Sequence, residues 1–292
     1  MDTALAAIAL ALALTALVVG QRQHRRAKRR WATLAEAASV ASRSAAHAMG
    51  FVASERLRSA GRTPRYPVDF RADCSEDVLL FHLFEGRLDG SCLECGAFDG
   101  LTASVTYALD AIGWKTILIE ASPGAAALCA KNRPASRVVH AAASARGASG
   151  TLRFVEVVPA TANGAGAVKP NSFVLGAKTP KAIPAAHVQT VVDVPRTTMD
   201  EVLAGAGTGG FIDAAVIDVE GHEMDLFDGW DFAKCCPRVL VVEEDPPGGR
   251  PELMRLLHGR GMVSVGQRGT NQIMVHESQA DLLARARLLM EG

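Results

Sequence analysis

The chain has 292 residues, of which 49% are hydrophobic and 5% aromatic, which is enough for one large domain with an aliphatic core. Its formal net charge is zero, but the first 30 residues hold six Lys or Arg side chains and a single acid, Asp2. The remainder is therefore mildly acidic, which argues against nucleic acid as a main partner. The six cysteines follow no disulfide or zinc spacing, so we expect buried, reduced thiols.

The N-terminal residues have the composition of a membrane segment. Residues 3–20 carry no charge, and a helix of this length reaches roughly 27 Å, close to the thickness of the hydrocarbon layer. A basic block over residues 22–30 follows at once, and basic residues tend to remain on the cytoplasmic side. The sequence thus predicts a transmembrane anchor over residues 1–20 and a cytoplasmic catalytic domain. The alternative is a cleaved signal peptide and a secreted protein, although signal peptides normally carry their positive charge before the apolar run.

The next segment, residues 21–67, is predicted to be a basic juxtamembrane segment and linker. Its end, residues 61–67, contains Gly and two prolines that interrupt regular structure. The folded domain is expected over residues 68–292. Residues 159–187 are rich in Ala, Pro, Gly and Lys without a clear period, which predicts a long, mobile surface insertion.

Within the domain, strands and helices are expected to alternate. Apolar runs predict strands at residues 91–97, 115–121, 137–143, 151–158, 188–194, 214–219 and 238–244. Helices are expected at residues 77–84, 103–112, 124–132, 198–204, 223–228, 251–259 and 281–290, and a hairpin at residues 262–266 and 272–276. This order predicts an α/β fold with a mostly parallel sheet covered on both faces, to which the hairpin adds an antiparallel strand. Ligands of such sheets bind at the carboxyl ends of the strands.

The loop after the first strand, residues 94–100, is the first candidate site. Gly96 and Gly100 lie in a G-x-x-x-G spacing, which differs from the G-x-G-x-x-G of dinucleotide-binding proteins. Glu94 and Asp99 disfavour a pyrophosphate and suit a ligand with an ammonium group, a sulfonium centre and ribose hydroxyls. The alternative is structural: Asp99 caps the following helix and Glu94 forms a local ion pair.

Acids also end three later strands. Glu120 ends the second strand, where a carboxylate can accept hydrogen bonds from a ribose diol. Asp218 lies at the end of the predicted strand over residues 214–219, Glu220 and His222 follow it, and Glu243 ends the next strand. Buried acids need partners, so this group indicates a functional site. No fixed ligand spacing supports a metal ion there, and none is predicted.

The sequence resembles the FkbM-type methyltransferase family over residues 75–280. The similar segments are, in order, LECGAFDG, LTASVTYALDAIGW, KTILIEASP, VVHAAAS, TTMDEVL, VIDVEGHEMDLFDGWDF and RVLVVEED. The run IDVEGHE is the most specific of them. Phe98 departs from the family, in which many members have Asn at this position.

The resemblance implies a Rossmann-like methyltransferase fold, S-adenosylmethionine as methyl donor, and O-methylation of a sugar or other hydroxylated metabolite. It implies that residues of the glycine loop line the amino-acid part and the sulfonium: Glu94, Gly96, Ala97, Asp99 and Gly100. It further implies that Glu120 holds the ribose, that Ala142 or its neighbour Ala141 lies near the adenine, and that Asp218 faces the methyl-transfer centre.

A hydroxyl acceptor benefits from a base that takes its proton, and His222 or Asp218 is the candidate. For His222 the alternative is a histidine at the start of a helix without a catalytic role. The acceptor is expected to be a small molecule, a glycan or a lipid. Two other functions stay open: an oxidoreductase that uses NAD, and a membrane-tethered binding or scaffold protein that retains the fold without catalysis.

Overall fold

The structure is a computed structural model that describes residues 44–159, 172–176, 187–244 and 248–291. The predicted anchor over residues 1–20 and residues 21–43 of the predicted juxtamembrane segment lie outside these residues. Every helix in the described ranges is too short or too polar to span a lipid bilayer. The chain divides into two units, and the unit Ala46–Gly292 contains all the elements described below.

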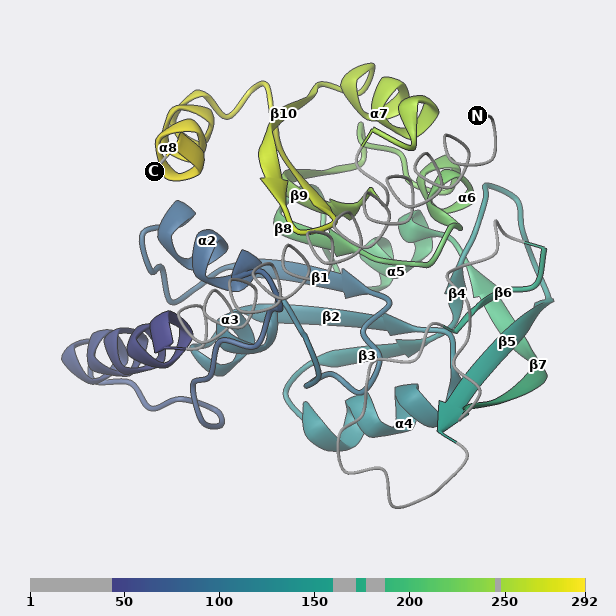
Figure 1. Cartoon of the computed structure of the whole chain (residues 1–292), viewed down its shortest axis with the longest axis horizontal. Coiled ribbons are helices and arrows are strands. Elements are labelled where there is room, and N and C mark those ends of the chain that lie inside the picture. Colours follow the sequence, from purple (N-terminus) through teal and green to yellow (C-terminus); the bar gives the residue numbers. More distant parts are fainter. Residues whose placement is uncertain (1–43, 160–171, 177–186, 245–247, 292) are drawn as a thin grey trace, which may run out of the picture. The chain divides into compact units, whose positions relative to one another are not determined.

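A seven-stranded sheet forms the centre of this unit (Figure 1). Its strand order is β10-β11-β9-β8-β1-β2-β3, and the five strands from β9 to β3 are parallel. The bounds are β1 Ser91–Cys95, β2 Lys115–Glu120, β3 Arg137–His140, β8 Gly210–Ile217, β9 Cys235–Glu243, β10 Met262–Arg268 and β11 Asn271–His276. The last two strands form the predicted hairpin, and β11 is antiparallel to β9. The expected α/β class with a mostly parallel sheet is thus confirmed.

The order of the strands fixes where a ligand can enter. From β1 the chain passes to β2 on one side of the sheet and later to β8 on the other side. The connections therefore leave β1 in opposite directions, and the carboxyl ends of β1 and β8 border a crevice. This crevice is where the predicted site residues that follow β1 and β8 meet.

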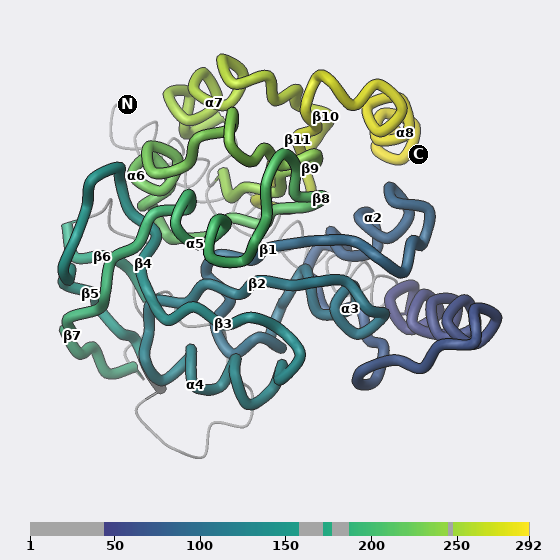
Figure 2. Tube along the Cα trace, turned by 180° about the vertical axis from the view of Figure 1, so that it is seen from behind, coloured from purple at the N-terminus to yellow at the C-terminus, as the bar shows by residue number. Residues whose placement is uncertain are grey.

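Helices cover both faces of the sheet because the central strands are apolar on both sides. Alternate residues of β8 belong to different cores: Ala214 and Val216 face one core, and Ala215 and Ile217 the other. The first core contains residues of α2 (Glu76–Leu83), α3 (Tyr107–Ala111) and α8 (Ala280–Glu291). The second contains residues of α5 (Met199–Gly205), α6 (Glu223–Asp228) and α7 (Pro251–His258). Figure 2 shows the same arrangement from behind.

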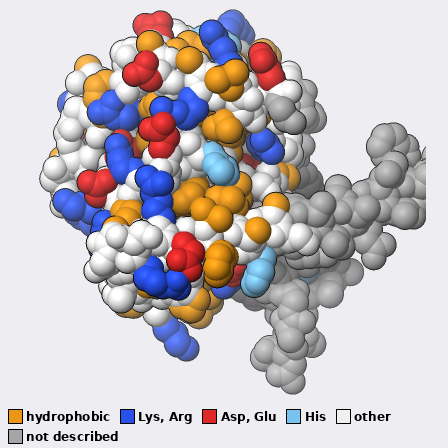
Figure 3. All heavy atoms as spheres, turned by 90° about the vertical axis from the view of Figure 1, so that its left-hand side faces the viewer, with side chains coloured by type: hydrophobic (Ala, Val, Ile, Leu, Met, Phe, Trp, Pro, Cys, Tyr) orange, Lys and Arg blue, Asp and Glu red, His pale blue; other side chains and the backbone are white. Residues whose placement is uncertain are grey.

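Residues 44–59 form a helix that belongs to the compact unit. Ala53 and Leu57 are buried in the first core, so the unit begins at Ala46, upstream of the expected start at residue 68. Phe51 and Val52 of this helix are 67% and 48% exposed. On the face that Figure 3 shows, apolar side chains form a group among Lys and Arg side chains.

A second, four-stranded sheet was not expected from the sequence. It consists of β4 (Ala142–Ala143), β5 (Thr151–Pro159), β6 (Phe173–Val174) and β7 (His187–Thr197), in the order β4-β7-β5-β6. Figure 1 shows it beside the carboxyl ends of β1 to β3. The predicted mobile insertion lies largely outside the described residues, yet its described part contributes β6, which pairs with β5. The insertion therefore supplies a wall of the region where the ligand is expected.

Candidate active site

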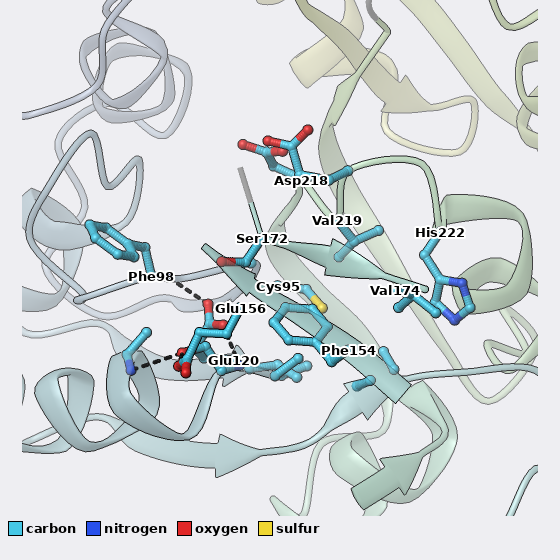
Figure 4. Close-up of a pocket in the computed structure, with 18 of the residues that line it drawn as sticks. Cys95, Phe98, Glu120, Phe154, Glu156, Ser172, Val174, Asp218, Val219 and His222 are labelled. Carbon is cyan, nitrogen blue, oxygen red and sulfur yellow. Dashed lines mark hydrogen bonds between the residues drawn. The ribbon is translucent and has the colours of Figure 1, made fainter. Parts of the chain in front are cut away.

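A cavity of about 300 Å³ lies at the carboxyl ends of the parallel strands, within the range of small-ligand sites (Figure 4). The loops after β1, β2 and β8 form one part of its wall, and the second sheet forms the other. Five of the predicted site residues line it: Gly96, Glu120, Ala142, Asp218 and His222. The other four, Glu94, Ala97, Asp99 and Gly100, lie outside its lining.

Gly96 marks the junction of β1 and β8. Its φ is +88°, and a Cβ atom built on it would lie 1.8 Å from the carbonyl oxygen of Asp218. The amide of Asp218 in turn donates a hydrogen bond to the carbonyl oxygen of Cys95, at 3.0 Å. No side chain fits between these two strand ends, so glycine is required here by the backbone.

Glu120 connects the end of β2 to the glycine loop. Its Oε2 accepts a hydrogen bond from the amide of Phe98 at 2.7 Å, and its Oε1 accepts one from the amide of Ser122 at 2.8 Å. Phe98 has a φ of +50° and lines the cavity. The role of Phe98 therefore lies in its backbone, because its amide orients the carboxylate of Glu120, the predicted ribose acceptor. A backbone donor leaves no signal in the residue type, so the sequence could not indicate it.

Glu94 is buried under the glycine loop, outside the lining of the cavity. Its Oε2 accepts hydrogen bonds from the hydroxyls of Ser104 and Thr106, both at 2.6 Å, and its Oε1 accepts one from the amide of Val105 at 3.0 Å. Arg133 contacts the same two hydroxyls, and Arg133 forms a fully buried ion pair with Asp110 at 2.8 Å. Glu94 therefore holds the chain that follows the loop.

These contacts also explain why the predicted helix over residues 103–112 is too long. Residues 104–106 wrap around the Glu94 carboxylate, and Ala103 has a φ of +54°, so α3 begins only at Tyr107.

The other three loop residues outside the cavity also have structural partners. Asp99 accepts hydrogen bonds from the amides of Leu101 and Thr102 at 2.8 and 2.7 Å and closes a local turn, whereas the N-cap of α3 is Thr106, so the capping role considered as its alternative is not observed. Ala97 packs with Cys129 in a small buried cluster. Gly100 has a φ of +75°, and a Cβ atom there would lie 3.4 Å from the Cα of Cys129.

His222 is buried at the start of α6 and lines the cavity. Its Nδ1 lies 3.2 Å from the Oδ2 of Asp225, and its Nε2 has no hydrogen-bond partner in the described part of the chain. Burial lowers the pKa of His222, which outweighs the opposite effect of the Asp225 carboxylate. The imidazole is therefore neutral at pH 7. Asp225 favours the tautomer with the proton on Nδ1, so that Nε2 carries the lone pair.

Negative charge accumulates beside Asp218, at the ends of β8 and β9. Burial and, to a smaller extent, the carboxylates of Asp218 and Glu220 together raise the pKa of Glu243 to about 8. Glu223 forms an ion pair with Arg250. Within the described residues, no three His, Cys, Asp or Glu side chains are arranged to hold a metal ion. The local charge favours a cationic ligand at this end of the cavity.

The sheet with its switch point between β1 and β8, and a cavity lined by acids at that point, define an α/β protein with a small-ligand cavity at the carboxyl ends of its strands. Residues 94–262 match the model of the methyltransferase FkbM domain. This range is more than half of the chain, and the protein belongs to the FkbM methyltransferase family, as the resemblance of its motifs implied. It is therefore a methyltransferase.

Comparison with solved structures finds further methyltransferases at low similarity. The methyltransferase domain of METTL16 is 10% identical, with a TM-score of 0.38, and the match covers 70% of this chain and 66% of that one. The C-terminal domain of precorrin-6Y C5,15-methyltransferase from Rhodobacter capsulatus is 14% identical, with a TM-score of 0.32, and the match covers 68% and 85%. A search of curated proteins gives no match.

Three residues of the site escaped the sequence analysis. Asp225 is one turn beyond His222, so the helical spacing of three could have identified it. Ser122 is the N-cap of α4 (Pro123–Asn132), a position that its Ser-Pro sequence indicates. Glu156 comes from the second sheet and has no motif around it.

Proposed function

We propose that this methyltransferase uses S-adenosylmethionine to methylate a hydroxyl group of a small molecule, a sugar or a lipid-linked acceptor. The observation that carries the proposal is the His222–Asp225 pair, in which His222 lines the same cavity as Gly96 and Glu120. A base and a candidate nucleoside site thus share one enclosed space. Nucleic acid is not proposed as the acceptor, because the body of the chain is mildly acidic.

The residues of the cavity fit the methyl donor. S-adenosylmethionine supplies a methyl group on a sulfonium centre, which is a good leaving group. Gly96 lets a ligand approach the backbone, Glu120 is placed for the ribose hydroxyls, and Ala142 leaves room for the adenine. The carboxylates around Asp218 favour the positive charge of the sulfonium.

His222 and Asp218 are proposed as the catalytic residues. In the neutral imidazole, Nε2 takes the proton of the acceptor hydroxyl, and Asp225 stabilises the imidazolium that forms. Asp218 lies against the glycine loop and contributes negative charge where the methyl group is transferred. The enclosed cavity holds donor and acceptor in line, which supplies much of the acceleration of a displacement reaction.

Calorimetry and a methyl-transfer assay on the full chain, purified in mild detergent, test this function. We expect S-adenosylhomocysteine to bind and NAD not to bind, and we expect transfer of a labelled methyl group to members of a panel of hydroxylated sugars and lipids. Absence of S-adenosylhomocysteine binding would refute the proposed cofactor. Binding without transfer to any acceptor in the panel would favour a non-catalytic binding protein, and binding of NAD an oxidoreductase.

We also propose that residues 1–20 anchor the protein in a membrane with its catalytic domain in the cytoplasm. The support is the uncharged segment over residues 3–20 and the basic block that follows it. The test is extraction of membranes at alkaline pH, with protease added to intact cells or spheroplasts. An anchored protein stays in the pellet and is protected from protease. A shortened, soluble chain outside the cell would instead identify a cleaved signal peptide.

A further inference from the structure

The part of the cavity next to α4 has largely apolar walls and includes the carboxylate of Glu156. Leu128, Phe154 and Ala142 line it, and Glu156 of β5 is the acid among them. Figure 4 shows the carboxylates of Glu120 and Glu156 on one side of the cavity and the imidazole of His222 on the other. A flat heterocycle can pack between such walls, and a carboxylate at its edge can accept hydrogen bonds only from a donor.

The side chain of Glu156 has a defined orientation. Its Oε1 accepts a hydrogen bond from the hydroxyl of Ser122, and that hydroxyl also accepts one from the amide of Ala125 at 3.2 Å, at the first turn of α4. The amide of Ser122 donates to Glu120, so one residue positions both carboxylates. The second sheet therefore places Glu156 at a fixed distance from the predicted ribose acceptor.

The order of the strands decides which part of a nucleoside ligand lies near Glu156. Across the sheet, β1 carries Gly96, β2 carries Glu120, and β3 leads to Ala142. With the sulfonium at Gly96 and the ribose at Glu120, the base extends towards Ala142 and α4. Glu156 contacts the residue that begins α4, so it lies at the edge of the base and away from the amino-acid part.

We propose that Glu156 determines the specificity for adenine, by accepting a hydrogen bond from the exocyclic amino group of the base. Hypoxanthine carries a carbonyl oxygen at this position, and two acceptors facing each other repel in a site of low polarity. This inference rests on the proposed cofactor, and it gives Glu156 a role in selecting the ligand that is separate from the reaction itself.

The test compares S-adenosylhomocysteine with S-inosylhomocysteine, in which the amino group of the base is replaced by a carbonyl oxygen and N1 carries a proton, by calorimetry on the full chain in detergent. A hydrogen bond to a charged acceptor is expected to favour the adenine compound by about ten- to a hundred-fold in Kd. In Glu156→Gln, the preference should fall to about two-fold or less, because the amide can donate to the carbonyl as well as accept from the amine. Glu120→Gln is the matched control, and it should weaken both compounds equally, since they share the ribose.

Each outcome has one meaning. Equal binding of both compounds to the unaltered chain would overturn the inference, whether or not the variant folds. An equal loss for both compounds in Glu156→Gln would also overturn it, because this is the result expected if Glu156 only stabilises Ser122 and α4. Absence of binding of either compound to the unaltered chain would refute the proposed cofactor itself, and with it the ligand for which Glu156 is proposed to select.

Discussion

Two groups of acids lie near the glycine loop, and they differ in whether they line the cavity. Behind the loop, the carboxylates of Glu94 and Asp99 accept hydrogen bonds from the residues that follow them in the chain. In front of it, Glu120, Glu156 and Asp218 line the cavity. Both groups look alike in the sequence, since each contains acids near the end of a strand. The comparison shows that an acid at a strand end is a ligand candidate only if its side chain reaches the cavity.

The largest effect is expected on catalysis, at His222, which lines the cavity. His222→Asn should lower kcat by about 10²- to 10⁴-fold, because it removes the proposed base, and it should leave the Kd of S-adenosylhomocysteine unchanged. The measurement is methyl transfer to an accepted substrate at saturating donor. An unchanged kcat would remove His222 from the reaction and leave Asp218 as the candidate base.

Asp225→Asn is the matched control for that variant, with a smaller fall in kcat. Because Asp225 raises the pKa of His222, its loss should move the acid limb of the pH profile of kcat to still lower pH. In the unaltered protein that limb should lie below the usual His value of about 6.5. If the acid limb of the profile stays at the same pH in Asp225→Asn, a group other than His222 titrates there.

The second prediction concerns the strand junction that separates the two groups of acids. In Gly96→Ala, the added Cβ would lie 1.8 Å from the Asp218 carbonyl oxygen, so β1 or β8 must shift. We expect a loss of roughly 3 kcal/mol or more in the free energy of unfolding. Gly150→Ala is the control, since Gly150 also has a positive φ but nothing within 4 Å, and only strain of about 1 kcal/mol is expected. Equal losses in thermal or urea unfolding would contradict the close approach.

The third prediction makes the same change, Glu to Gln, in one acid of each group: Glu94 outside the cavity and Glu120 in its lining. Glu94→Gln should cost about 1–3 kcal/mol of stability, because buried hydroxyls lose a charged acceptor, while the Kd of S-adenosylhomocysteine changes little. Glu120→Gln should instead weaken binding by about ten-fold. Unfolding curves and calorimetry on both variants decide between them. A large binding defect in Glu94→Gln without loss of stability would mean that Glu94 contacts the ligand.

The smallest effect is expected at Glu243, beside the acids of the cavity. Its pKa is raised from 4.5 to about 8, so the folded protein binds the proton more tightly than the unfolded chain does. Its contribution to stability is therefore full below about pH 4.5 and is lost as the pH rises through about 8. Glu243→Gln, which does not titrate, should therefore gain stability relative to the unaltered protein as the pH rises through this window. Melting temperatures that keep a constant difference from pH 5 to 9 would contradict the raised pKa.

The main sheet was predictable because each of its central strands is a short apolar run between helices. The predicted strands over residues 91–97 and 115–121 correspond to β1 and β2, and the predicted hairpin corresponds to β10 and β11. The second sheet was not predictable as a sheet. Its two long strands, β5 and β7, correspond to the predicted strands over residues 151–158 and 188–194, but β4 and β6 have only two residues each, which is too few for an apolar pattern.

The sequence by itself determined the α/β class, the position of the glycine loop, and the strand-end residues Glu120, Asp218 and His222, because these depend on local pattern and on motif. The tertiary structure decided which acids reach the cavity. Glu94 turns towards Ser104 and Thr106, whereas Glu156 arrives from a sheet that forms by pairing of distant segments. Such pairings depend on the packing of the whole unit, and the residue type of an acid does not encode the face on which its carboxylate lies.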